Sequence, residues 1–143
     1  MIIPDVNILI HAYQSPAERH PDARAWWERT MTSPRPVGLA WVVLIGFIRI
    51  TTHRGILRNP LPSAHAVQIV RGWLGSSSVQ IVNPGVRHAD ILFRLIEEVG
   101  VAGNLTTDAH LAALAIEYQA EIASTDNDFA RFQGLRWFNP VAS

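Results

Sequence analysis

The alternation of apolar and polar positions divides the chain into short strands and longer helices. Four stretches are short and mostly aliphatic, as buried strands are, and they span residues 1–4, 37–40, 79–82 and 121–124. Residues 135–138 can add an edge strand. Because helical segments separate these strands, the pattern predicts an α/β fold with a mainly parallel central sheet covered by helices on both faces.

Between the strands, apolar residues recur at helical spacing. Six helices are predicted, over residues 7–13, 20–32, 41–52, 63–74, 84–99 and 108–119. Pro16 breaks the first of them, and Gly100 ends the fifth. The helix over residues 41–52 is the most apolar, and Arg49 is its one charged residue. We therefore expect Arg49 to pair with a carboxylate or a phosphate, a structural ion pair being the simpler reading.

Length and composition limit the classes of protein to which the chain can belong. With 143 residues, 48% of them apolar, the chain is expected to form one domain over residues 1–143 with a packed core. No apolar run reaches the roughly 18 to 20 residues that a membrane span needs. The N-terminus also lacks the basic leader of a signal peptide. We expect a cytoplasmic protein that does not cross a membrane.

Two residue types are missing, and each absence excludes a kind of chemistry. The chain has no cysteine, which excludes disulfides, thiolate catalysis and cysteine-ligated zinc. It also has no lysine, which excludes P-loop nucleotide hydrolases and Schiff-base enzymes. Twelve arginines balance twelve acids, so nucleic acid would have to be bound by a local patch and not by the charge of the whole protein.

Four aspartates are placed where a parallel sheet brings distant segments together. Asp5 ends the first strand, Asp108 opens a helix, and Asp126 and Asp128 follow the fourth strand. The carboxyl ends of parallel strands line the crevice in which open α/β folds bind ligands. Clustered carboxylates repel one another unless a cation neutralises them. The pattern therefore predicts a site for Mg²⁺ or Mn²⁺, which prefer oxygen ligands and assist phosphodiester hydrolysis.

Each acid also has a purely structural explanation. Asp5 can cap the following helix, Asp108 gains from the dipole at a helix N-terminus, and residues 124–128 are rich in turn and cap residues. Together these explanations are weaker, because they do not say why acids end three separate core segments. Five other acids are interpreted as solvated helix faces: Asp90, Glu97, Glu98, Glu117 and Glu121. His110, two positions after Asp108, could reach a substrate but does not share its helix face, and the other five histidines show no metal-ligand spacing.

Four stretches of the chain resemble the PIN-domain nucleases, and among them the VapC-type toxins of bacterial toxin–antitoxin pairs. They are residues 3–9 (IPDVNIL), 41–52 (WVVLIGFIRITT), 103–115 (GNLTTDAHLAALA) and 123–132 (ASTDNDFARF). The first stretch alone is a weak signal, whereas the last two, in this order and at this spacing, are specific. The resemblance covers essentially the whole chain.

The resemblance implies a three-layer α/β/α fold and a Mg²⁺- or Mn²⁺-dependent endoribonuclease. Such proteins cut RNA, commonly form homodimers and are inhibited by a small cognate antitoxin protein. By position, four acids become the candidate catalytic residues: Asp5, Asp108, Asp126 and Asp128. Asp5 and Asp108 would hold the metal, Asp126 would complete the site directly or through water, and Asp128 would support it. Three further residues would orient these groups: Asn7, Thr125 and Arg49.

The sequence departs from the family at one position. Many members carry a glutamate on the third helix, three residues before an arginine like Arg49, and here Gly46 stands in its place. Either the remaining aspartates suffice, with weaker or single-metal binding, or catalysis is impaired and the protein binds RNA or an antitoxin without cutting. We favour an active enzyme, since the other acids are all in place.

Other classes share part of the pattern. A phosphatase of the haloacid dehalogenase type is suggested by an Asp-x-Asn run after the first strand. That chemistry uses a second aspartate where this chain has Asn7, and it uses a lysine, which the chain lacks. Receiver domains are disfavoured by the same missing lysine. A purely structural protein would leave the gathered acids unexplained.

Overall fold

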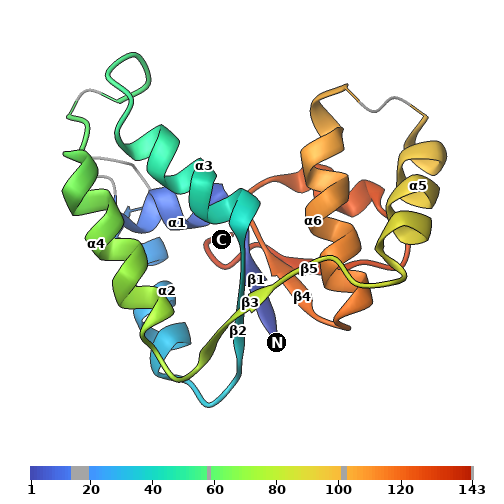
Figure 1. Cartoon of the computed structure of the whole chain (residues 1–143), viewed down its shortest axis with the longest axis horizontal. Helices are drawn as coiled ribbons and strands as arrows, with labels where there is room; N and C mark the ends of the chain where they lie inside the picture. The colour runs from blue at the N-terminus through green and yellow to red at the C-terminus, as the bar shows by residue number, and fades with distance from the viewer. Residues whose placement is uncertain (14–19, 58, 101–102, 143) are drawn as a thin grey trace.

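A computed structural model describes residues 1–13, 20–57, 59–100 and 103–142 of the protein, built around one five-stranded sheet (Figure 1). The strands are β1 (Ile2–Pro4), β2 (Val37–Ala40), β3 (Val79–Val82), β4 (Glu121–Ala123) and β5 (Arg136–Phe138). Their order across the sheet is β3-β2-β1-β4-β5, and every pairing is parallel. The predicted α/β fold with a mainly parallel sheet is confirmed, down to the edge strand at residues 136–138.

Six α-helices cover the sheet on both faces. They are α1 (Val6–Tyr13), α2 (His20–Thr32), α3 (Trp41–Thr51), α4 (Ser63–Leu74), α5 (His88–Val99) and α6 (Thr106–Glu117), with short 3-10 helices at η1 (Gly103–Leu105) and η2 (Asn127–Arg131). Figure 1 shows α1 to α4 on one side of the sheet and α5 with α6 on the other. This is the expected three-layer α/β/α arrangement. The break predicted at Pro16 lies outside the described residues.

The core lies where both faces of the central strands meet these helices. Ile3 of β1 and Ile122 of β4 are fully buried, as strands of a parallel sheet covered on both sides must be. Leu9, Phe47 and Leu114 fill the helix faces that pack toward them, and each is at most 1% exposed. Among the described residues, no helix is long and apolar enough to cross a membrane.

The start of α5 differs from its prediction. The helix begins at His88 and not at Pro84, because the preceding loop is tied to α6. The Glu117 carboxylate accepts hydrogen bonds from the backbone N–H groups of Gly85 (2.8 Å) and Arg87 (3.0 Å). Glu117 is therefore not simply a solvated residue, as the sequence had suggested. Its bonds with this loop keep residues 84–87 out of the helix.

The strand order places the ends of β1 and β4 side by side. The chain builds outward from β1 to β2 and β3 in one direction and to β4 and β5 in the other. In open α/β sheets, the crevice at such a reversal of strand order is the usual ligand site. The Asp5 N–H donates to the Ala123 carbonyl at 2.9 Å, which joins the residue after β1 to the last residue of β4.

Candidate active site

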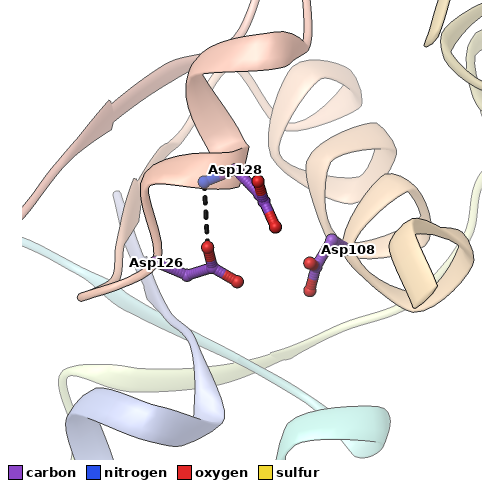
Figure 2. A group of neighbouring side chains, drawn as sticks. All are labelled: Asp108, Asp126 and Asp128. Carbon is purple, nitrogen blue, oxygen red and sulfur yellow. Dashed lines mark hydrogen bonds between the residues drawn. The ribbon is translucent and has the colours of Figure 1, made fainter.

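Three of the four predicted aspartates gather at this edge of the sheet. Asp108 lies in the first turn of α6, and Asp126 and Asp128 lie just after β4. One carboxylate oxygen from each lies within 4.8 Å of the others, and Figure 2 shows the three side chains converging on one space. Residues about 20 positions apart in sequence are thus brought together by the packing of α6 beside β4.

Turn chemistry holds two of these acids in place. Asp126 is the N-cap of η2, and its Oδ1 accepts a hydrogen bond of 2.9 Å from the Asp128 backbone N–H, drawn as a dashed line in Figure 2. This is the ordinary cap interaction that satisfies a free N–H at a helix start. The capping role and the clustering therefore coexist: the turn fixes where both carboxylates lie.

Asp5, the fourth acid, is held deeper in the molecule. Its side chain is 7% exposed, and its two oxygens accept hydrogen bonds from the Val6 N–H (2.7 Å) and from the Ser124 hydroxyl (2.8 Å). It lines a small pocket together with Asp108 and with Val42 and Val43 of α3. Asp5 is not among the three carboxylates within 4.8 Å of one another, but it borders the same space from the end of β1.

Ser124 joins these segments, although it was not among the candidate residues predicted from the sequence. It is fully buried, and its hydroxyl lies 2.8 Å from Asp5 Oδ2 and 3.2 Å from Asn7 Oδ1. The same oxygen accepts a hydrogen bond of 3.0 Å from the Asp126 N–H. One buried hydroxyl thus ties the residue after β1 to the acidic turn after β4. Its position directly after a strand was the signal that could have identified it.

Burial and repulsion between the acids raise the pKa of two of them, Asp108 and Asp5. Burial raises the pKa of Asp108 to about 7, with repulsion from Asp5, Asp126 and Asp128 acting in the same direction. Burial also raises the pKa of Asp5, against the lowering effect of its hydrogen bonds with Ser124 and Val6. Near neutral pH it is therefore energetically unfavourable for all of these acids to be ionised at once.

The predicted supporting residues have different surroundings. Asn7 lies in this network, since its Oδ1 accepts from the Ser124 hydroxyl (3.2 Å) and from the Thr125 backbone N–H (3.4 Å). Thr125 thus takes part through its backbone. Arg49 is exposed in the last turn of α3, and among the described residues it makes no ion pair, so the expected structural ion pair stays a prediction. Arg49 lies on the solvent side of α3, and no acid lies between Glu28 and Asp90 in the sequence.

Gly46 lies on the side of α3 that faces α1. A Cβ atom at this position would lie 3.3 Å from Cγ2 of Val6, the residue after Asp5. A glutamate here would therefore start its side chain against the beginning of α1, beside the aspartate that follows β1. The glycine keeps the two helices close and leaves the site with aspartates alone.

A histidine pair borders the site without joining it. His88 of α5 and His110 of α6 are hydrogen-bonded, Nε2 to Nδ1, at 3.0 Å. Burial, together with the neighbouring His88, lowers the pKa of His110. The pair links the two helices of this layer. It could not be predicted from the sequence, because residues 22 positions apart share no periodic pattern.

The residues present fit a divalent cation with hard ligands. The site offers clustered carboxylate oxygens from two chain segments, with Asp5 of a third segment bordering them. Neither a cysteine in the chain nor the mutually bonded histidine pair competes as a softer ligand. Oxygen ligands of this kind suit Mg²⁺ and Mn²⁺ better than zinc. A bound cation would also remove the repulsion that raises the pKa of Asp108.

Comparison with known families agrees with this geometry. The family model of the PIN domain matches residues 2–135. The chain belongs to the PIN-domain family. Among curated relatives of this PIN domain, Ribonuclease VapC33 and Ribonuclease VapC37 of Mycobacterium tuberculosis are each 45% identical to it, over 141 and 142 residues and 99% of both chains. The resemblance to VapC-type proteins is thereby confirmed.

Solved structures share the fold of this PIN domain at low sequence identity. Mycobacterium tuberculosis VapC20, described as a sarcin-ricin loop cleaving toxin, superposes with a TM-score of 0.68 at 18% identity, covering 95% of this chain and 99% of that one. VapBC-1 from nontypeable Haemophilus influenzae gives 0.70 at 15% identity, covering 99% of this chain and 100% of the other. At these identities, the match supports the fold.

Proposed function

We propose that this PIN domain is a divalent-metal-dependent endoribonuclease, the toxin of a VapBC-type toxin–antitoxin pair. The observation that carries the proposal is the convergence of Asp108, Asp126 and Asp128 at the reversal point of the sheet, bordered by Asp5. The full-length relatives named as VapC ribonucleases support the reaction class. Hydrolysis of an RNA phosphodiester is the reaction that such a site serves.

In this proposal each acid has a role. Asp5, Asp108 and Asp126 hold Mg²⁺ or Mn²⁺, and Asp128 supports the site from η2. When bound, such an ion relieves charge on the phosphoryl oxygens and lowers the pKa of water. Burial and the neighbouring acids raise the pKa of Asp108 to about 7. A bound cation would displace that proton, so Asp108 would serve as a metal ligand in its ionised form.

Residues behind the acids keep them in position. Ser124 and Asn7 hold Asp5 and the turn of Asp126 in one hydrogen-bonded unit, so the carboxylates need not rearrange when substrate arrives. We assign Arg49 and Thr125 supporting roles of a different kind. Thr125 acts through its N–H, and Arg49 acts from the exposed end of α3.

The proposal extends to partners and setting. The substrate is RNA, the inhibitor is a small cognate antitoxin protein, and the toxin acts as a homodimer in the cytoplasm. Residues 1–143 form a single domain, on the ground that one sheet and one hydrophobic cluster join the described elements. A monomer throughout the micromolar range in light scattering would contradict the homodimer.

Cleavage of end-labelled structured RNAs by the purified protein tests the reaction. We expect discrete products with Mg²⁺ or Mn²⁺, none with EDTA, and none from Asp108→Asn or Asp5→Asn prepared identically. Circular dichroism of both variants should match that of the unsubstituted protein. Products that persist with EDTA or in both variants would refute the site assignment.

Gly46 favours a second candidate, a PIN domain that binds RNA or an antitoxin without cutting. Without a carboxylate on α3, the site depends on the aspartates that remain. No cleavage over a broad RNA panel, together with no Mn²⁺ binding, would support this candidate over the enzyme.

A further inference from the structure

The balanced net charge of the protein conceals an uneven distribution of charge between two groups of helices. Residues 41–74, which include α3 and α4, contain four arginines and no acid. Residues 88–128, which include α5, α6 and the acidic turn, contain eight acids and one arginine. Figure 1 shows these two groups of helices on opposite sides of the sheet. A polyanion that reaches the carboxylates is therefore attracted along the α3–α4 side and repelled by the other.

Trp41 lies where this basic side meets the site. It is the first residue of α3 and directly follows the carboxyl end of β2, the strand next to β1. The two residues after it, Val42 and Val43, line the pocket that contains Asp5 and Asp108. Trp41 therefore stands at the same edge of the sheet as the candidate active site.

Trp41 is also unusual among the five tryptophans. Its side chain is 50% exposed, whereas Trp26, Trp27 and Trp73 are at most 9% exposed and Trp137 is half-buried. A large aromatic ring left in water beside a ligand site gains free energy from a flat apolar partner. Unpaired nucleobases are such partners, and they stack on aromatic rings whatever their sequence.

Two further exposed residues continue this face along α3. Ile45 is 60% exposed, and Arg49 is exposed in the last turn. Residues four apart share a helix face, so Trp41, Ile45 and Arg49 form one stripe about 12 Å long at 1.5 Å per residue. Figure 1 shows α3 running away from α6, which places Arg49 at the end of the stripe distant from the acids.

Resting on the proposed ribonuclease function, we propose that this stripe guides single-stranded RNA into the site. Trp41 stacks on a base beside the cleaved phosphodiester, and Arg49 contacts a phosphate farther along the strand. RNA is favoured over a protein partner because residues 41–74, which surround the stripe, contain arginine and histidine and no acidic residue. That charge complements a chain of phosphates.

Tryptophan fluorescence tests the stacking in an Asp108→Asn background, which binds RNA without cutting it. Titration with a single-stranded oligoribonucleotide should quench the emission, because Trp41 is the exposed tryptophan. Trp41→Ala should remove the quenching and weaken binding about 5- to 150-fold, as expected for one lost base stack. Trp41→Phe should remove the quenching and retain most of the affinity. Phe93→Ala is the matched control, since Phe93 is 58% exposed on α5 of the acidic side.

Salt dependence tests Arg49. In the same background, Arg49→Gln should weaken RNA binding and reduce the slope of log affinity against log salt by about 0.7, the value for one phosphate contact on a single strand. Arg94→Gln, on α5 and paired with Glu98, should leave the slope unchanged. An unchanged slope in Arg49→Gln would contradict the phosphate contact.

The outcomes separate this inference from the function on which it rests. If the unsubstituted protein cleaves RNA while Trp41→Ala binds and cleaves it equally well, the stripe is not the RNA path and the nuclease stands. If Trp41→Ala changes the oligomeric state in light scattering and not RNA affinity, the face belongs to a second copy and the inference is wrong. Absence of both cleavage and binding in the unsubstituted protein would overturn both proposals.

Discussion

Asp108 is the acid whose pKa is raised to about 7 by burial and by the neighbouring carboxylates. Its carboxyl is partly buried and faces repulsion from Asp5, Asp126 and Asp128, which together raise its pKa to about 7. An acid whose folded pKa lies above its unfolded value of 3.8 binds more protons in the folded state. Folding is therefore favoured when Asp108 is protonated, and that advantage is lost as the pH rises from about 4 to about 7.

Removing this charge should stabilise the metal-free protein at neutral pH. In EDTA at pH 7.5, we expect Asp108→Asn to raise the free energy of unfolding by about 1 to 2 kcal/mol, a value reduced for the solvent around a partly exposed carboxyl. At pH 4.5 the gain should largely disappear. Thermal unfolding at the two pH values measures this gain in stability. Asp90→Asn is the control, because Asp90 is an exposed acid on α5. An equal change in Tm at both pH values would contradict the repulsion.

Replacing Ser124 should lower stability and metal affinity more than replacing its neighbour Thr125. Ser124→Ala removes the hydroxyl that bonds buried Asp5 and half-buried Asn7 and Asp126, so we expect a loss of about 1 to 3 kcal/mol in stability. Mn²⁺ affinity should fall by about 10- to 100-fold, as for other residues that orient ligands. Thr125→Ala is the control, because Thr125 bonds Asn7 through its backbone, and it should change little.

At the scale of helices and strands, the spacing of apolar residues predicted most of the structure. Hydrogen bonds between residues distant in sequence account for the exceptions. Strand and helix spacing reflects burial along the chain, which periodicity records directly. The start of α5 depends on Glu117, which lies 32 residues after Gly85, and no local pattern contains that bond. The Ser124 network likewise joins residues more than 100 positions apart, so the sequence indicated the acids but not the hydroxyl that positions them.

The bond between Glu117 and the loop before α5 should be visible as a pH-dependent stability. Hydrogen bonds from Gly85 and Arg87 lower the pKa of Glu117, so its stabilising effect is present above the unfolded pKa of 4.5 and is lost as the pH falls below that value. We expect Glu117→Gln to have a lower Tm than the unsubstituted protein at pH 7, with the difference shrinking toward pH 3. A difference that is constant with pH would show that the charge is irrelevant.

At the scale of the whole molecule, a net charge near zero does not show how charge is distributed over the fold. From that balance we expected RNA to need a local patch. The fold places α3 and α4, whose segment carries arginines and no acid, on the side of the sheet opposite α5 and α6. Separation could not be foreseen from composition, because it depends on which helices cover which face of the sheet. The acids of one side make the cation site, and the arginines of the other leave a path for RNA in our proposal.

Calorimetric titration of Mn²⁺ tests the central claim, that the gathered aspartates form a divalent-metal site. At neutral pH we predict saturable binding that is accompanied by proton release, because a cation displaces the proton held by Asp108. Buffers of different ionisation enthalpy measure that release. Asp108→Asn should lower the affinity at least about tenfold and abolish the proton release, while Asp90→Asn should do neither. Absence of saturable Mn²⁺ binding, or binding equally tight in Asp108→Asn, would contradict the account.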